Sequence, residues 1–247
     1  MRLRKSFIIN CCLKAVFFSI IFLLSACSKI NQQPDELFIN KFSACGQIKE
    51  LEQDESLILK FRALYLDSKT KIRETGYILK RQASSYTYSR IEGKDNETGI
   101  EISLNQKVDG YIHSHYENLF PIFSGSDIKS VYDAFLINKI KNLNTFIVGV
   151  VTAAGTAYLL KVKNPDEFID YARINLEDGE SYQKFQTDYN NLTIVYSSLG
   201  NVIAFETALL KMLECSGLEL YKGNMNFNSW SGMMLDAHGN VVLKKCT

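Results

Sequence analysis

The segment that most constrains the fold is the run TFIVGVVT at residues 145–152. It is apolar and dense in β-branched residues, which is typical of a strand buried on both faces of a sheet. The turn Ala154-Gly155 follows, and residues 156–162 form a second, mostly apolar segment. Strand and helix patterns mix around this centre, so we expect an α/β chain of α+β type, with one mixed sheet flanked by helices.

Apolar side chains that recur at helical spacing predict helices, and short apolar or alternating runs predict strands. We expect helices over residues 54–65, 126–140, 165–176 and 201–215, and another around residues 182–189. We expect further strands over residues 76–80, 86–91, 99–104 and 110–115, and a hairpin over residues 230–235 and 240–244. Residues 164–247 are therefore predicted to be a mostly helical extension that ends in a β-hairpin.

The overall composition excludes several classes of protein. Apolar residues make up 46% of the 247 residues and charged residues 22%, which is an ordinary globular balance that excludes disorder and coiled coil. The chain has 28 Lys plus Arg against 27 Asp plus Glu, a formal net charge of +1. Without a basic excess, we expect no nucleic-acid partner.

The N-terminal segment has the pattern of a secretory signal. Residues 1–14 carry basic side chains and no acid, and residues 15–24 are uncharged. Those ten residues are too few to span a hydrocarbon core about 30 Å thick as a helix, whereas a basic start followed by a short apolar stretch is typical of a cleaved signal peptide.

The next residues, Leu24-Ser25-Ala26-Cys27, resemble the lipobox of bacterial lipoproteins. The resemblance implies a signal peptide over residues 1–26, lipid on Cys27, and a tether over residues 27–36 that holds the protein to a membrane. Because Ser28 rather than Asp follows the cysteine, the expected location is the bacterial cell envelope, at the outer membrane.

Three cysteines remain after the predicted cleavage and lipidation: Cys45, Cys215 and Cys246. In an oxidising compartment the simplest count is one disulfide plus one free thiol, and the spacing leaves the pairing open. Cys246 lies beside the C-terminus and would gain most from a bond that holds the end of the chain.

His113 and His115 form the part of the sequence most suggestive of chemistry. Both lie on the predicted strand 110–115, and side chains two residues apart on a strand point to the same face. Asp127 follows at the start of a predicted helix, where the helix dipole favours an ionised carboxylate. Two histidines and one carboxylate, with a fourth position for water, are typical of a catalytic zinc site.

These residues also resemble a known motif. Tyr-Ile-His-Ser-His at residues 111–115, followed by Ser-Gly-Ser-Asp at residues 124–127, resembles the JAMM motif of the JAB/MPN metallopeptidases. The JAB-like domains of bacterial polymorphic-toxin proteins are the most similar branch. The sequence departs from the motif at two points: eight residues separate His115 from Ser124, one more than usual, and Tyr116 replaces a common proline.

The resemblance implies a role for each matching residue. His113, His115 and Asp127 would bind zinc, and Ser124 would donate a hydrogen bond to the oxyanion of the reaction. A glutamate from an upstream element would act as the general base.

Glu74 is the best match for that glutamate, because Glu74-Thr75-Gly76 precedes an apolar strand as the family pattern requires. Glu101 is the alternative. Glu74 could equally be a surface carboxylate.

The resemblance covers residues 72–163 and implies a JAMM-like metallohydrolase domain over residues 37–163. The resulting hypothesis is a membrane-tethered, zinc-dependent hydrolase that cleaves a peptide or isopeptide bond in an unidentified peptide or protein substrate. The alternatives are a non-catalytic envelope lipoprotein that uses a JAB-like fold as a binding module, and a toxin-linked or immunity-type surface protein.

Overall fold

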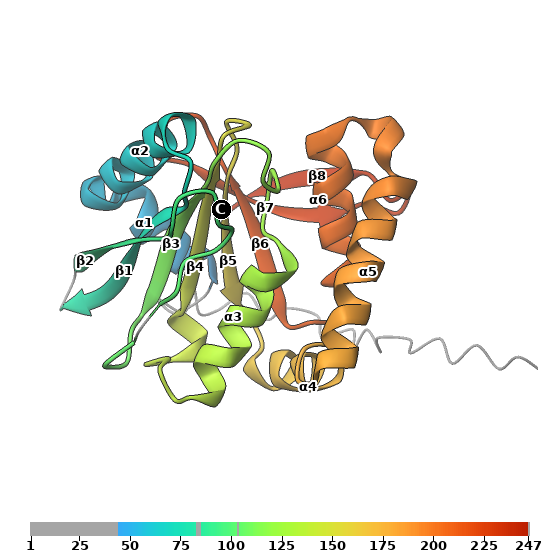
Figure 1. The fold of residues 1–247 in the computed structure, drawn as a ribbon, viewed down its shortest axis with the longest axis horizontal. Helices are drawn as coiled ribbons and strands as arrows, with labels where there is room; N and C mark the ends of the chain where they lie inside the picture. Colours follow the sequence, from blue (N-terminus) through green and yellow to red (C-terminus); the bar gives the residue numbers. More distant parts are fainter. Residues whose placement is uncertain (1–43, 83–84, 103, 247) are drawn as a thin grey trace, which may run out of the picture. The chain divides into compact units, whose positions relative to one another are not determined.

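The computed structural model describes residues 44–82, 85–102 and 104–246, which belong to one compact unit (Figure 1). The predicted signal peptide, the tether and Cys27 lie outside the described residues. Within the described ranges, no helix combines the length and the apolar character needed to cross a membrane.

The described residues form a mixed sheet of eight strands, which confirms the predicted fold class. The order across the sheet is β2-β1-β3-β4-β5-β6-β7-β8. Strands β3 and β4 are parallel, and every other neighbouring pair is antiparallel. The strands are β1 (Thr75–Gln82), β2 (Ser85–Glu92), β3 (Gly110–His115), β4 (Ile147–Thr152), β5 (Ala157–Val162), β6 (Leu218–Gly223), β7 (Trp230–Leu235) and β8 (Val241–Lys245).

Helices cover both faces of this sheet, and each face has its own apolar core. The helices are α1 (Ala44–Gln53), α2 (Glu55–Thr70), α3 (Gly125–Leu136), α4 (Pro165–Asn175), α5 (Gly179–Val195) and α6 (Asn201–Met212). Phe61 of α2 belongs to the same cluster as Ile112 of β3, whereas Ile128 of α3 belongs to the cluster that contains Tyr111. Even-numbered residues of β3 therefore face α1 and α2, and odd-numbered residues face α3 to α6.

The central apolar run forms β4, as predicted, and all six of its residues are buried. Strands β3 and β5 pair with its two edges, and the two apolar cores cover its two faces. Burial from every side explains why this run shows no alternation of polar and apolar residues.

The prediction of a strand over residues 99–104 is wrong, because residues 99–102 and Leu104 form no strand. Both edges of β3 are already paired, with β1 and β4, so this segment cannot pair with the histidine strand. Instead, Ile102 and Leu104 pack onto the apolar cluster on the α3 side.

The region 164–247 contains both of the predicted features, the helices α4 to α6 and the hairpin β7–β8. It also supplies β6, which pairs with β5 and which the sequence analysis did not anticipate. The short helix α1 was likewise not anticipated. The predicted boundary at residue 163 lies between β5 and α4, and the sheet continues on both sides of it.

A disulfide joins Cys45 of α1 to Cys246, just after β8. The end of the chain is therefore held covalently against the first described helix. Cys215 is not a free thiol either, so the expected count of one disulfide plus one free cysteine is wrong.

Candidate metal centre

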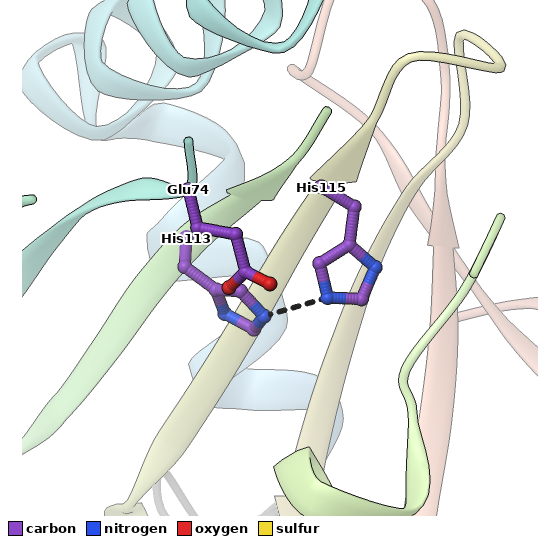
Figure 2. A group of neighbouring side chains, drawn as sticks. All are labelled: Glu74, His113 and His115. Carbon is purple, nitrogen blue, oxygen red and sulfur yellow. Dashed lines mark hydrogen bonds between the residues drawn. The ribbon is translucent and has the colours of Figure 1, made fainter. Parts of the chain in front are cut away.

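Strand β3 presents His113 and His115 on the face of the sheet that α3 covers. Both side chains are buried, and their Nε2 atoms lie 3.1 Å apart. Figure 2 shows the two imidazole rings converging, with the Glu74 carboxylate beside them. The alternation of side chains along a strand thus brings two nitrogen ligands to one point, as the sequence predicted.

Asp127 reaches this point from the first turn of α3. Its Oδ1 lies 3.1 Å from Nε2 of His113, and its Oδ2 lies 3.4 Å from Nε2 of His115. A capping box holds the carboxylate, because Oδ2 accepts hydrogen bonds from the backbone N–H of Ser124 at 2.6 Å and from its hydroxyl at 2.7 Å. These bonds occupy Oδ2, whereas Oδ1 faces Nε2 of His113.

The spacing of these atoms fits a small divalent ion. Ligands at Zn–N and Zn–O distances of about 2.0–2.1 Å in a tetrahedron lie about 3.3 Å from one another. The separations of His113 Nε2 from His115 Nε2 and from Oδ1 of Asp127, both 3.1 Å, are close to that value. Two imidazoles and a carboxylate are also the donor set that zinc favours.

The second ring nitrogen of His115 is already bound. Nδ1 donates a hydrogen bond to the carbonyl oxygen of Phe120 at 2.8 Å, since a carbonyl can only accept. This bond orients the ring and leaves Nε2 as the lone-pair nitrogen of the neutral form. Nδ1 of His113 is buried and has no hydrogen-bond partner within the described ranges.

The electrostatics of the cluster favour positive charge. Burial alone would lower the pKa of His115, but the hydrogen bond that it donates to Asp127 and the charge of that carboxylate raise the pKa to about 9. Burial alone would raise the pKa of Asp127, but His113 and His115 hold it well below its usual value. The carboxylate is therefore ionised, and the cluster stabilises a cation placed between these three side chains.

Glu74 immediately precedes β1 and is buried beside the histidines. One carboxylate oxygen of Glu74 and one nitrogen from each of His113 and His115 all lie within 4.8 Å of one another, so these three side chains could together hold a metal ion. Oε1 of Glu74 accepts a hydrogen bond from the N–H of Gly99 at 2.8 Å.

The antiparallel register of β1 and β3 brings Glu74 to this place. Gly76 lies opposite His113, so two residues earlier Glu74 lies at the level of His115 and on the same face. A side chain at Gly76 would not fit, since a Cβ atom there would come within 2.6 Å of the carbonyl oxygen of Ile112. The Glu-x-Gly spacing thus allows β1 to approach the histidine strand closely.

Replacing Gly76 by alanine is expected to push β1 away from β3 and to displace Glu74 from the histidines. We expect the free energy of unfolding to fall by about 1–3 kcal/mol, the usual cost of overpacking, and metal affinity to fall with it. Gly179→Ala is the matched control, because nothing lies within 4 Å of a Cβ at Gly179. Thermal unfolding with and without added zinc measures both effects, and equal behaviour of the two variants would contradict this account.

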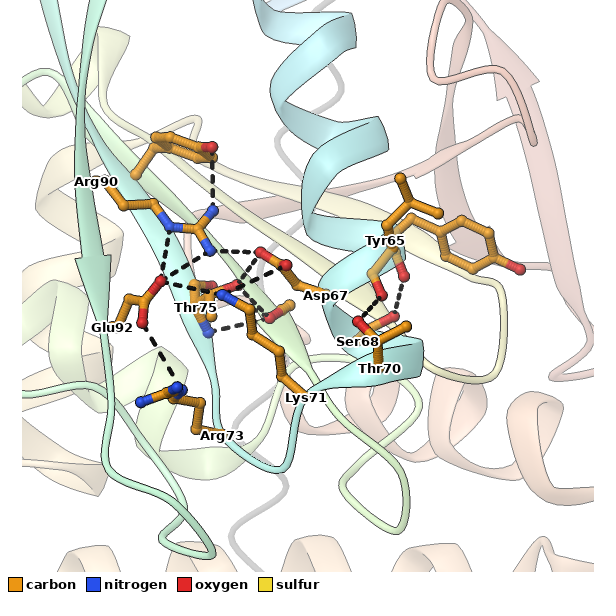
Figure 3. A network of polar contacts seen from close by, with 12 residues as sticks. Tyr65, Asp67, Ser68, Thr70, Lys71, Arg73, Thr75, Arg90 and Glu92 are labelled. Atoms are coloured by element: carbon orange, nitrogen blue, oxygen red, sulfur yellow. Dashed lines mark hydrogen bonds and ion pairs between the residues drawn. The ribbon is translucent and has the colours of Figure 1, made fainter.

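A polar network on the face of the sheet that α2 covers holds β1 in place. The hydroxyl of Ser114, between the two histidines, accepts a hydrogen bond from the N–H of Thr75 at 3.0 Å and donates to its carbonyl oxygen at 3.2 Å. Figure 3 shows how Thr75 continues this network through Asp67 of α2 to Arg90 of β2. The residue next to Glu74 is therefore bound to α2 as well as to β3.

Two residues of the candidate metal centre, His115 and Asp127, line a cleft of about 690 Å³. His113 lines a second pocket of about 220 Å³, which shares Glu74, Gly99 and Asp127 with the cleft. Glu74, Thr98 and Gly99 line one part of the cleft. Gln186, Tyr189 and Asn190 of α5 also line the cleft. The sequence analysis missed these three α5 residues, because amide and tyrosine side chains on a helix carry no pattern that links them to a strand seventy residues earlier.

The remaining predicted site residues have distinct positions. Ser124 lines the cleft, and its hydroxyl donates to Asp127, so in this structure Ser124 holds the carboxylate. Glu101 is exposed and does not belong to the lining of the cleft or to the Glu74, His113 and His115 group.

The chain matches no protein-family model, no curated protein and no solved structure.

Proposed function

We propose that the protein is a zinc-dependent hydrolase of the JAMM type that cleaves a peptide or isopeptide bond. The observation that carries the proposal is the convergence of His113, His115 and Asp127, whose ligand atoms lie 3.1–3.4 Å apart, beside a cleft that His115, Asp127 and Glu74 line. The family resemblance of the sequence around these residues supports the same conclusion.

His113, His115 and Asp127 are the residues that would hold the ion. Zinc bound there would lower the pKa of a water molecule to about 7 and polarise the substrate carbonyl. Glu74 accepts the proton of the attacking water and passes it to the leaving amine, as a general base and then a general acid. The N–H of Gly99 holds one oxygen of Glu74, and the other oxygen would accept the proton.

Ser124 has two roles in this proposal. In the resting site its hydroxyl donates to Asp127 and orients that ligand. In the reaction, rotation of the hydroxyl toward the cleft, which Ser124 lines, would donate a hydrogen bond to the oxyanion of the tetrahedral intermediate, while its backbone N–H continues to hold Asp127.

Zinc content together with cleavage of peptide and isopeptide reporters tests this function. We expect the purified protein to bind zinc in near-stoichiometric amount and to cleave at least one reporter, with activity lost on chelation and restored by zinc. Protein that binds zinc but cleaves none of the reporters would favour the binding-module alternative. Folded protein that cannot be loaded with zinc would contradict the proposal.

We further propose that the protein is a lipoprotein of the bacterial cell envelope, anchored through Cys27. The residues Leu24-Ser25-Ala26-Cys27 support this proposal. Cys27→Ala is expected to prevent lipid attachment and to leave uncleaved precursor, which labelling with a fatty-acid analogue and the apparent mass on a gel would detect. A variant that is processed and membrane-bound as before would refute the lipobox assignment.

A further inference from the structure

The helix α5 comes from the region outside the motif resemblance, yet it lines the cleft above the candidate metal centre. Two contacts fix its position. The hydroxyl of Tyr189 donates to the carbonyl oxygen of Phe123 at 3.0 Å. Gly125, the first residue of α3, lies so close to α5 that a Cβ there would come within 3.3 Å of Cγ of Gln186. The cleft wall is thus fixed to the same short segment that positions Asp127.

The chemical character of the cleft indicates what it can bind. Its described lining includes the carboxamides of Asn118, Gln186 and Asn190 and contains no lysine or arginine. The acidic side chains in it are Glu74 and Asp127, whose charge a divalent ion would balance. A phosphate or another strongly anionic ligand would therefore find no lysine or arginine to pair with, whereas carboxamides can pair with the N–H and C=O groups of a peptide chain.

The spacing of two of these carboxamides matches an extended chain. Gln186 and Asn190 are four residues apart on α5, so they lie on one face of the helix at an axial distance of about 6 Å. Alternate residues of an extended chain repeat every ~6.7 Å and present their backbone groups on the same side. The two carboxamides can therefore bond to alternate peptide units of one strand-like segment.

Both side chains are available for such bonds. Gln186 and Asn190 are exposed. Gln186 uses one N–H to donate to the hydroxyl of Tyr182 at 2.9 Å, which orients its amide and leaves its carbonyl oxygen and second N–H. The carboxamide of Asn190 has no hydrogen-bond partner among the described residues.

We propose that Gln186 and Asn190 are substrate-positioning residues that bind the main chain of an extended peptide segment whose scissile carbonyl lies at the metal centre. This inference rests on the proposed hydrolase function and deepens it. The inference assigns binding of the substrate main chain to α5, because the carboxamides bond to backbone N–H and C=O groups, which every peptide has whatever its sequence. Selection among sequences then falls to the rest of the cleft.

The affinity of hydroxamates for the zinc-loaded protein tests the role of Gln186 and Asn190, and this test does not depend on turnover. Acetohydroxamate carries only the metal-binding group, whereas an N-acetyl-trialanine hydroxamate adds a peptide chain to it. Calorimetry on zinc-loaded protein would measure both affinities in the wild type, in a Gln186→Ala, Asn190→Ala variant and in a Gln183→Ala, Asn191→Ala variant. The last variant is the matched control, because Gln183 and Asn191 lie on α5 but do not line the cleft.

We expect the peptide hydroxamate to bind more tightly than acetohydroxamate to the wild type and to the control variant. Loss of the two hydrogen bonds should reduce that advantage roughly tenfold or more in the Gln186→Ala, Asn190→Ala variant. Acetohydroxamate should bind all three proteins equally, and thermal unfolding would verify that they are folded.

Two outcomes would overturn the inference, and they are distinguishable. If acetohydroxamate binds but the peptide part adds nothing, or adds as much in the Gln186→Ala, Asn190→Ala variant, the role of α5 is refuted and the metal centre stands. If acetohydroxamate binds none of the zinc-treated proteins, the metal centre itself fails, and the inference fails with it.

Discussion

Replacing His113 and His115 together by alanine is expected to abolish zinc binding and all hydrolytic activity. Both nitrogen ligands disappear, so the loss of affinity should exceed the roughly 10–100-fold that follows removal of a group hydrogen-bonded to a ligand. Metal analysis after dialysis measures the bound zinc. Since the ligands must be deprotonated and the pKa of His115 is raised to about 9, zinc affinity of the wild type should also fall as the pH is lowered below that value.

Two further variants make this experiment decisive. His238→Ala removes the third histidine, which lies in the turn between β7 and β8, and should keep all of the zinc. Asp127→Asn retains the shape of the third side chain and should lower zinc affinity even where the double histidine variant is poorly folded. Full zinc retention in folded His113→Ala, His115→Ala protein would show that the ion binds elsewhere.

Replacing Glu74 by glutamine is expected to separate catalysis from metal binding. The amide keeps the size of the side chain and can still accept from the N–H of Gly99, but it cannot take a proton. Zinc content and stability should therefore stay nearly unchanged, while turnover falls by about 10²–10⁴-fold, as is usual when a positioned general base is lost. Single-turnover cleavage of a reporter that the wild type cuts would measure the effect.

Glu101→Gln is the control, because Glu101 is exposed and does not line the cleft. It should keep full activity. The zinc content of Glu74→Gln protein tests the assignment of roles, since one oxygen of Glu74 lies close enough to the histidines for direct binding of a metal. If Glu74→Gln loses zinc and activity in parallel, Glu74 is a ligand rather than the base.

The central strand β4 and the shared orientation of the two histidines on β3 could be predicted from the sequence. The apolar run that became β4 and the two-residue spacing of His113 and His115 are local patterns, and the geometry of a strand translates them directly into burial and shared orientation. The start of α4 could also be predicted, because Asn164 caps the helix and Pro165 begins it. The segment 99–104 was predicted wrongly, since its alternation resembles a strand, whereas Ile102 and Leu104 pack onto an apolar cluster without joining the sheet.

The sequence by itself therefore determined an α+β chain with two histidines on one face of a strand and a carboxylate at the start of the following helix. Only the tertiary structure decided that Glu74 rather than Glu101 lies beside them, because the register between β1 and β3 sets that distance. It also decided that α5 lines the cleft. Local periodicity depends on the geometry of one element, whereas strand pairing and helix docking depend on which edges and faces the whole chain leaves free.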